Sequence, residues 1–196
     1  MRFAAIVLAA GRASRMGENK LVAEVGGKAI VRRAAEAAVA SKASPVIVVT
    51  GHERERVEAK LAGLGVVIVH NPRYADGMST SLKAGLAALP PNVEAAAILL
   101  GDMPEVDGAL VGKLVTALEG GKKIAIPVRD GRQGNPVVWA RALFPALAKL
   151  EGDHGAKALI AAHRAAVAEI PAGAAAFSDV DTPDALAALR ARQKGA

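Results

Sequence analysis

Leu8-Ala9-Ala10-Gly11-Arg12-Ala13-Ser14-Arg15-Met16-Gly17-Glu18-Asn19-Lys20 directly follows the apolar run Phe3–Val7, which predicts a buried strand that opens into a loop. The small residues at positions 9–11 let a ligand approach the backbone, whose N–H groups can then point at phosphate oxygens. Arg15 and Lys20 add two cations just beyond. The stretch therefore predicts a triphosphate-binding loop at the end of the first strand.

This loop differs from two common phosphate-binding patterns. No Gly-Lys-Ser/Thr closes it, so it is not a P-loop. Gly11 and Gly17 have the wrong spacing for the dinucleotide-binding pattern G-x-G-x-x-G.

The rest of the chain alternates short apolar runs with Ala-rich amphipathic runs. This alternation predicts an α/β fold, a three-layer α/β/α sandwich around a mainly parallel sheet, with ligands at the carboxyl ends of the strands. We expect one domain over residues 1–196, with a hairpin-like excursion at 129–134. The predicted strands are 2–8, 45–50, 66–69, 95–100, 124–128, 136–140 and 167–170. The predicted helices are 29–40, 53–61, 79–88, 109–119, 142–150, 156–162 and 183–191.

Composition narrows the class of protein. The chain has 196 residues, is 52% hydrophobic, carries a formal net charge of +6 and contains no cysteine. No apolar run approaches the ~18 residues that span a bilayer, and no signal-peptide layout is present, so we expect a cytoplasmic protein without a membrane partner. Aromatic residues make up 3% of the chain, and Lys and Arg are not clustered. The basic charge therefore indicates a small polyanionic substrate rather than nucleic acid.

Two acidic segments are candidate metal sites. Asp102 follows the apolar run 95–100, so it is placed at the carboxyl end of a buried strand, where Mg²⁺ is commonly held by one or two carboxylates and substrate phosphates. The alternative is that Asp102 only begins a turn. Asp179 and Asp181 share one face of an extended segment, and the alternative there is helix capping by Asp181 or Thr182.

The loop and these acidic segments together resemble the molybdenum cofactor nucleotidyltransferases, a branch of the nucleoside-triphosphate transferases. The resemblance rests on residues 8–20, on Gly101-Asp102-Met103-Pro104, on Asp179-Val180-Asp181-Thr182-Pro183-Asp184, and on Gly77-Met78-Ser79-Thr80-Ser81-Leu82. It extends from Ala5 to about Leu186. It implies a Rossmann-like sheet of the nucleotide-diphospho-sugar transferase type.

The resemblance also implies roles for individual residues. Arg15, Lys20 and Asp102 would be catalytic, and Asp102 with Asp181 would hold Mg²⁺. Ser81 would contact the base, whereas Ser79 is equally compatible with base contact and with helix capping. The implied nucleotide-binding set is Leu8, Ala9, Ala10, Gly11, Arg15, Lys20, Gly77, Ser79, Ser81 and Asp102. The implied acceptor-binding set is Asn135, Pro136, Asp153 and Gly155, where Asn135 stands in place of the His common in the family.

The activity that the resemblance implies is transfer of CMP from CTP to the terminal phosphate of a molybdopterin-type cofactor, with release of pyrophosphate. Leu-Ala-Ala-Gly tends to accompany cytidylyl transfer in the family, and Leu-Ala-Gly-Gly guanylyl transfer, so a GTP-dependent enzyme is the nearest alternative. A sugar-alcohol-phosphate cytidylyltransferase and a non-catalytic carrier of the cofactor are further alternatives. Transient contact with a client molybdoenzyme or its chaperone is also expected.

Overall fold

A single eight-stranded sheet forms the centre of the protein. The computed structural model describes residues 1–11, 19–152 and 155–194. The strand order is β10-β7-β9-β6-β1-β4-β5, with β8 paired to β7, and a separate two-stranded sheet joins β2 and β3. The strands are β1 (Phe3–Ala9), β2 (Glu24–Val25), β3 (Lys28–Ala29), β4 (Val46–Thr50), β5 (Val67–His70), β6 (Ala95–Leu100), β7 (Ile124–Arg129), β8 (Arg132–Gln133), β9 (Val137–Ala140) and β10 (Val167–Pro171).

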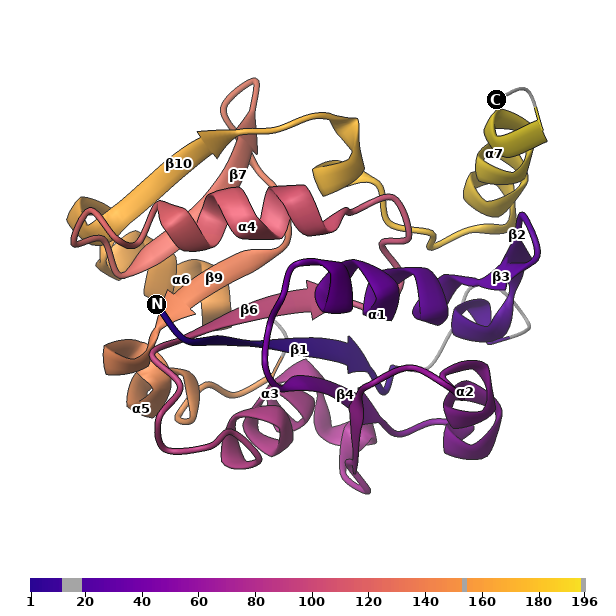
Figure 1. Cartoon of the computed structure of the whole chain (residues 1–196), viewed down its shortest axis with the longest axis horizontal. Coiled ribbons are helices and arrows are strands. Elements are labelled where there is room, and N and C mark those ends of the chain that lie inside the picture. The colour runs from indigo at the N-terminus through magenta and orange to yellow at the C-terminus, as the bar shows by residue number, and fades with distance from the viewer. Residues whose placement is uncertain (12–18, 153–154, 195–196) are drawn as a thin grey trace.

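Helices cover both faces of this sheet, as Figure 1 shows for α1 and α4 on one face and α3 and α5 on the other. The α-helices are α1 (Ile30–Ala40), α2 (Arg54–Lys60), α3 (Met78–Ala87), α4 (Gly108–Thr116), α5 (Phe144–Leu147), α6 (Gly155–Ala162) and α7 (Pro183–Lys194). Short 3₁₀ segments are η1 (Lys20–Val22), η2 (Tyr74–Asp76), η3 (Arg141–Leu143), η4 (Arg164–Ala166) and η5 (Ala174–Phe177).

The central strands are parallel and are buried on both faces. In β1, Val7 pairs in register with Val48 of β4 and Leu99 of β6. These three side chains are at most 2% exposed. A strand buried on both faces reads as a continuous apolar run, and β1, β4 and β6 do so. Only β8 and β9 run antiparallel to their neighbours in the sheet.

Two apolar clusters hold the layers together. One lies between the sheet and α1, α2 and α4, and the other between the sheet and α3, α5 and α6. Helix α3 lies directly on β1: a Cβ on Gly85 would stand 2.5 Å from Cγ2 of Ile6. This close approach brings the N-terminus of α3 to the carboxyl end of β1.

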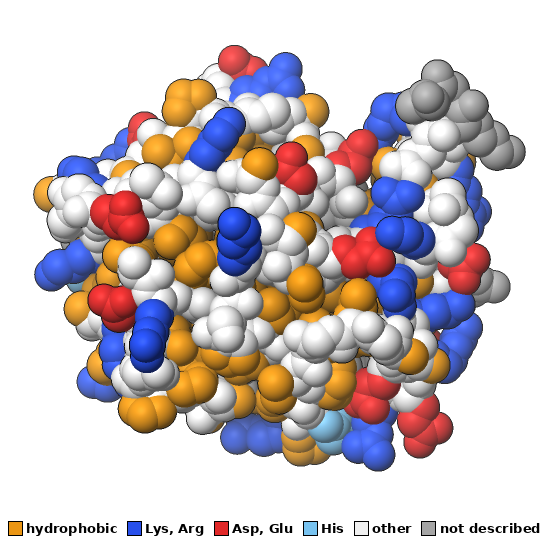
Figure 2. All heavy atoms as spheres, viewed as in Figure 1, with side chains coloured by type: hydrophobic (Ala, Val, Ile, Leu, Met, Phe, Trp, Pro, Cys, Tyr) orange, Lys and Arg blue, Asp and Glu red, His pale blue; other side chains and the backbone are white. Residues whose placement is uncertain are grey.

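A third apolar cluster packs α7 against the rest of the protein. Leu186 and Leu189 of α7 pack with Val25 and Ile30, next to the β2–β3 hairpin. Figure 1 shows α7 and this hairpin together at one end of the molecule, and Figure 2 shows Lys, Arg, Asp and Glu side chains gathered there. The chain must therefore cross the carboxyl edge of the sheet between β10 and α7.

The predicted architecture is confirmed. Each predicted strand is present to within about one residue at either end, and the excursion at 129–134 is the β7–β8 hairpin. The predicted helix 142–150 is shorter, because η3 takes its first turn and α5 ends at Leu147. The β2–β3 hairpin was not predicted. In the described part of the chain, no helix is long and apolar enough to cross a bilayer.

Candidate active site

The carboxyl ends of β1 and β6 form the floor of the candidate site. The Gly101 N–H donates to the Leu8 carbonyl at 2.9 Å, so the residue before Asp102 is bonded to the predicted phosphate loop. A Cβ on Gly101 would lie 2.9 Å from that carbonyl oxygen and 3.2 Å from Cβ of Ala9. Glycine is therefore required for the two strand ends to approach this closely, and Asp102 emerges beside the loop.

Asp181 reaches the same place from the segment before α7. The Val180 N–H donates to the Asp102 carbonyl at 3.0 Å. Val180 is 4% exposed and packs in the cluster beneath α7, which anchors the segment. The neighbouring residue, Asp181, is thereby held beside Asp102. Thr182 directly precedes α7, and its hydroxyl accepts from the Ala185 N–H at 3.2 Å, so the capping hydrogen bond comes from Thr182.

Lys20 joins the two carboxylates. Its Nζ donates to Oδ2 of Asp102 at 2.7 Å and also to Oδ1 of Asp181. Lys20 begins η1, whose first turn is capped by Oδ1 of Asn19 accepting from the Leu21 N–H at 3.1 Å. Three residues that the sequence singled out therefore meet at one point.

The charged groups of the site shift one another's pKa values. Burial alone would lower the pKa of Lys20, but the charge and hydrogen bond of Asp102, reinforced by Asp181, hold that pKa above its usual value. Asp179 lies nearby. Its pKa is raised, first by desolvation and then by a hydrogen bond with Asp181 and the negative charges of Asp181 and Asp102. Negative charge is thus concentrated here, with Lys20 as its counter-ion.

The carboxylates fit a divalent cation. Oδ1 of Asp102 is buried and has no hydrogen-bond partner, and an orphaned carboxylate oxygen of this kind is well suited to a hard cation. Across the described residues, no three His, Cys, Asp or Glu side chains form a ready-made metal site. The candidate site therefore supplies two carboxylates, and oxygens of a substrate would complete it.

Beyond β1, Gly11 begins the predicted phosphate loop. Among the described residues, no heavy atom lies within 4 Å of a Cβ placed on Gly11. Ala10, by contrast, is 3% exposed. Its carbonyl accepts from the His52 N–H at 3.1 Å, and a Cβ on Gly51 would lie 2.8 Å from that of Ala10. The methyl group of Ala10 thus points toward Gly51, at the end of β4. A Cβ on Gly51 would also lie 2.7 Å from Cβ of Tyr74.

The serines of α3 point in different directions. Gly77, with φ of 109°, is the N-cap of α3, and Ser79 lies inside the helix, so Ser79 is not its N-cap. Ser79 lines a pocket, and its N–H donates to the Gly152 carbonyl at 3.2 Å. Ser81 is 4% exposed, and its hydroxyl accepts from Nδ2 of Asn71 at 2.9 Å. Ser81 therefore helps to fix the loop at the end of β5.

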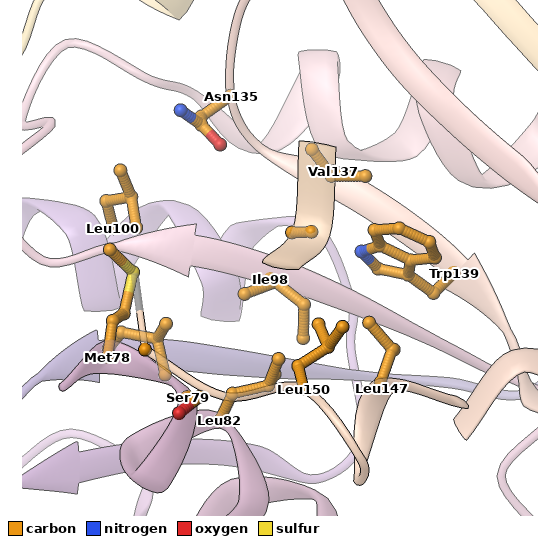
Figure 3. Close-up of a pocket in the computed structure, with 13 residues that line it drawn as sticks. Met78, Ser79, Leu82, Ile98, Leu100, Asn135, Val137, Trp139, Leu147 and Leu150 are labelled. Atoms are coloured by element: carbon orange, nitrogen blue, oxygen red, sulfur yellow. The ribbon is translucent and has the colours of Figure 1, made fainter. Parts of the chain in front are cut away.

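An apolar pocket opens beside the strand ends. It encloses about 560 Å³, including its open part. Figure 3 shows Asn135 at one side and Ser79 at the other, with Trp139 and aliphatic side chains between them. The lining residues are Leu8, Met78, Ser79, Leu82, Ile98, Leu100, Asn135, Val137, Trp139, Leu147, Leu150, Gly152 and Ala156.

The predicted acceptor residues fall partly on this pocket. Asn135 lines it, and its N–H donates to the Ala176 carbonyl at 2.9 Å. Pro136 is buried behind Asn135. Gly155 begins α6, and the next residue, Ala156, lines the pocket. Arg15 and Asp153 lie outside the described residues.

Sequence reasoning missed the pocket wall. Met78, Trp139, Leu147 and Leu150 come from three segments, namely α3, β9 and α5 with the turn that follows it, and each reads locally as an ordinary core residue. Asn71 was also missed, although a polar amide immediately after a predicted strand was a usable signal. Its Nδ2 donates to Thr80 as well as to Ser81, which joins the end of β5 to α3.

Comparisons with known proteins identify the family and the fold. The MobA-like NTP transferase domain matches residues 5–189. The molybdenum cofactor cytidylyltransferase of Escherichia coli (strain K12) is 29% identical over 181 residues, which cover 91% of each chain. The crystal structure of Rv0371c from Mycobacterium tuberculosis H37Rv superposes with a TM-score of 0.86 at 27% identity, covering 97% of this chain and 98% of that one. A manganese complex of Rv0371C has a TM-score of 0.83 at 25% identity, covering 97% and 99%.

Proposed function

Since this chain belongs to the MobA-like NTP transferase domain family and is a nucleotidyltransferase, we propose that it transfers CMP from CTP to the terminal phosphate of a molybdopterin cofactor, releasing pyrophosphate. The observation that carries the proposal is the meeting of Lys20, Asp102 and Asp181 beside the small-residue loop at the end of β1. The relative from Escherichia coli, which aligns with 91% of this chain, is named a molybdenum cofactor cytidylyltransferase.

In this reaction the acceptor phosphate attacks the α-phosphorus of CTP in line, and pyrophosphate leaves. The acceptor phosphate is already ionised at neutral pH, so the protein need not supply a general base. Its work is positioning and charge stabilisation. The loop backbone around Gly11 and the ammonium of Lys20 bind the triphosphate, and Arg15 is assigned to the same task.

Asp102 and Asp181 would hold Mg²⁺, which supplies neutralisation of phosphate charge when it is bound. A divalent cation at this site is supported by the orphaned Oδ1 of Asp102. Two carboxylates suit a cation that also takes oxygens from substrate phosphates. Lys20 stabilises the charge that develops on the departing pyrophosphate.

The apolar pocket is assigned to the ring system of the acceptor. Leu8 and Leu100 belong both to the pocket wall and to the strands that carry the loop and Asp102. A planar heterocycle seated between Trp139 and Leu150 would therefore have its phosphate side chain near the reacting centre. Asn135 and Ser79 provide polar groups at the two sides of the pocket (Figure 3).

Pyrophosphate release from each of the four NTPs, with and without purified molybdopterin, tests the proposal. We expect release only with CTP and only when the acceptor is present. Release with GTP instead would identify a guanylyltransferase. No release with any NTP, in a protein that still binds molybdopterin, would favour a non-catalytic carrier.

Ala10→Gly is expected to shift nucleotide use toward GTP. Removing the methyl group that faces Gly51 opens space at the ends of β1 and β4 and loosens the loop. A single methyl group discriminates by only about 1–3 kcal/mol, so we expect the ratio of kcat/KM for CTP over GTP to fall by about tenfold, without inversion. An unchanged ratio would mean that the base is chosen elsewhere, most directly by residues 77–81.

Met78→Lys is expected to weaken acceptor binding with little effect on stability. Met78 lines the pocket but is 44% exposed, so the fold does not depend on burying it. A charged head at the mouth of an apolar pocket opposes entry of a ring, and we expect KM for molybdopterin to rise about tenfold while KM for CTP stays within about twofold. Equal effects on both KM values would remove the pocket from the acceptor site.

A further inference from the structure

The cation of Lys20 lies where a divalent cation would be bound. We infer that Lys20 and the divalent cation compete for Asp102 and Asp181, and that nucleotide binding releases this competition by drawing Lys20 onto the triphosphate. Binding of metal and of nucleotide would then reinforce each other. The nucleotide half of this inference rests on the proposed function, whereas the competition itself does not.

Geometry supports the competition. Nζ of Lys20 lies 2.7 Å from Oδ2 of Asp102 and also contacts Oδ1 of Asp181. One ammonium thus bridges the same two carboxylates that are proposed to hold the metal ion. Two cations cannot share this space without strong repulsion, so Lys20 must withdraw before a metal ion can take both carboxylates.

The ion pair between Lys20 and Asp102 is more shielded than pairs on the surface, whereas the second partner, Asp181, is 40% exposed. The Lys20 side chain is 15% exposed and that of Asp102 20%. The pair formed by Lys28 and Glu36 has exposures of 52% and 31%. Exposed pairs are weakened by water and salt, so it is mainly at Asp102 that Lys20 competes strongly with a metal ion.

The Lys20 ion pairs also leave one oxygen of Asp102 available to another cation. Lys20 uses Oδ2 of Asp102, and the other oxygen, Oδ1, remains buried without a partner. Lysine has a flexible stem and a compact point charge, so it can exchange one set of anionic oxygens for another. A triphosphate arriving at the loop around Gly11 offers such oxygens close to the start of η1.

Competition with Lys20 is one reason to expect weak metal binding by the nucleotide-free protein, and a second reason makes a different prediction for Lys20 variants. With two carboxylates and no substrate oxygens, the site would bind a metal ion weakly even without Lys20. Under that explanation, removing the ammonium leaves metal affinity unchanged. Under competition, removing it strengthens metal binding, although it also removes a group expected to bind nucleotide.

The test is Mn²⁺ binding to the nucleotide-free protein, followed by the EPR signal of free Mn²⁺, for the native chain, Lys20→Met and Lys20→Gln. We expect both variants to bind Mn²⁺ at least about tenfold more tightly. Lys28→Met, which removes an ammonium from the exposed pair with Glu36, is the matched control and should bind like the native chain. Asp102→Ala added to Lys20→Met should abolish the gain, which places the ion at this site.

The same titration is repeated with saturating α,β-methylene CTP, which cannot transfer CMP. The native chain should gain more Mn²⁺ affinity from the analogue than Lys20→Met does. Unchanged or weaker Mn²⁺ binding by both Lys20 variants, each shown by circular dichroism to be folded, overturns the inference even if CTP turnover is normal. Tighter binding in a protein that fails to use CTP would uphold the competition and reject the proposed function.

Discussion

Asp102→Ala is expected to abolish turnover while the protein remains folded. Asp102 holds one oxygen toward Lys20 and a second, buried oxygen without a partner, so its carboxylate contributes to the site rather than to the core. Loss of a metal ligand forfeits several kcal/mol of charge stabilisation in the transition state. We expect kcat/KM to fall by at least about 1,000-fold and the thermal midpoint to change by only a few degrees.

Asp107→Ala is the matched control for this variant. Asp107 is a nearby carboxylate that caps α4, where it accepts from the Leu110 N–H at 2.8 Å. Its loss should lower stability by about 1 kcal/mol and leave turnover unchanged. Asp102→Ala should therefore lose activity but not stability, and Asp107→Ala should lose stability but not activity. Turnover of Asp102→Ala within about threefold of the native rate, at saturating Mg²⁺, would reject a catalytic role for Asp102.

Lys20→Ala is expected to lower kcat more than it raises KM for CTP. If the ammonium chiefly meets charge that develops on pyrophosphate, its contribution is larger in the transition state than in the bound ground state. We expect kcat to fall by about 100-fold or more, with KM rising less than about tenfold. Arg15→Ala is expected to behave in the same way.

Steady-state kinetics at saturating acceptor measure this division, with Lys60→Ala as the control. Lys60 forms an exposed pair with Glu24 at 2.8 Å and contacts neither Asp102 nor Asp181, so its loss should change neither constant. A rise in KM alone for both Lys20→Ala and Arg15→Ala would show that these cations only anchor the bound nucleotide.

The sequence predicted the sheet well because its strands carry the signal themselves. Residues 95–100 form an uninterrupted apolar run, and the strand has those bounds. The β2–β3 hairpin escaped prediction because each strand has only two residues, too few to establish a period of two. Helix α5 ends early for a tertiary reason, since the following segment turns to bring Leu150 and Gly152 to the pocket.

The candidate site was predictable where a motif occupies one stretch of chain. Lys20, Asp102 and Asp181 were each singled out from local sequence, and the structure brings them together. Their direct ion pairing was not predictable, because it depends on the Val180–Asp102 backbone bond. The orientations of Ser79 and Ser81 were equally hidden, since they depend on how α3 rotates against β1.

The ion pairs of Lys20 have a consequence for how the protein is made. Lys20 is separated from Asp102 by 82 positions and from Asp181 by 161. Closing such long loops is entropically costly, and contacts of this separation form late in folding. An unfinished chain on the ribosome could build the β1–β4–β5 side of the sheet, yet its phosphate loop would lack both acids. On the proposed function, the growing chain would gain its complete site only after the segment before α7 has crossed the sheet edge.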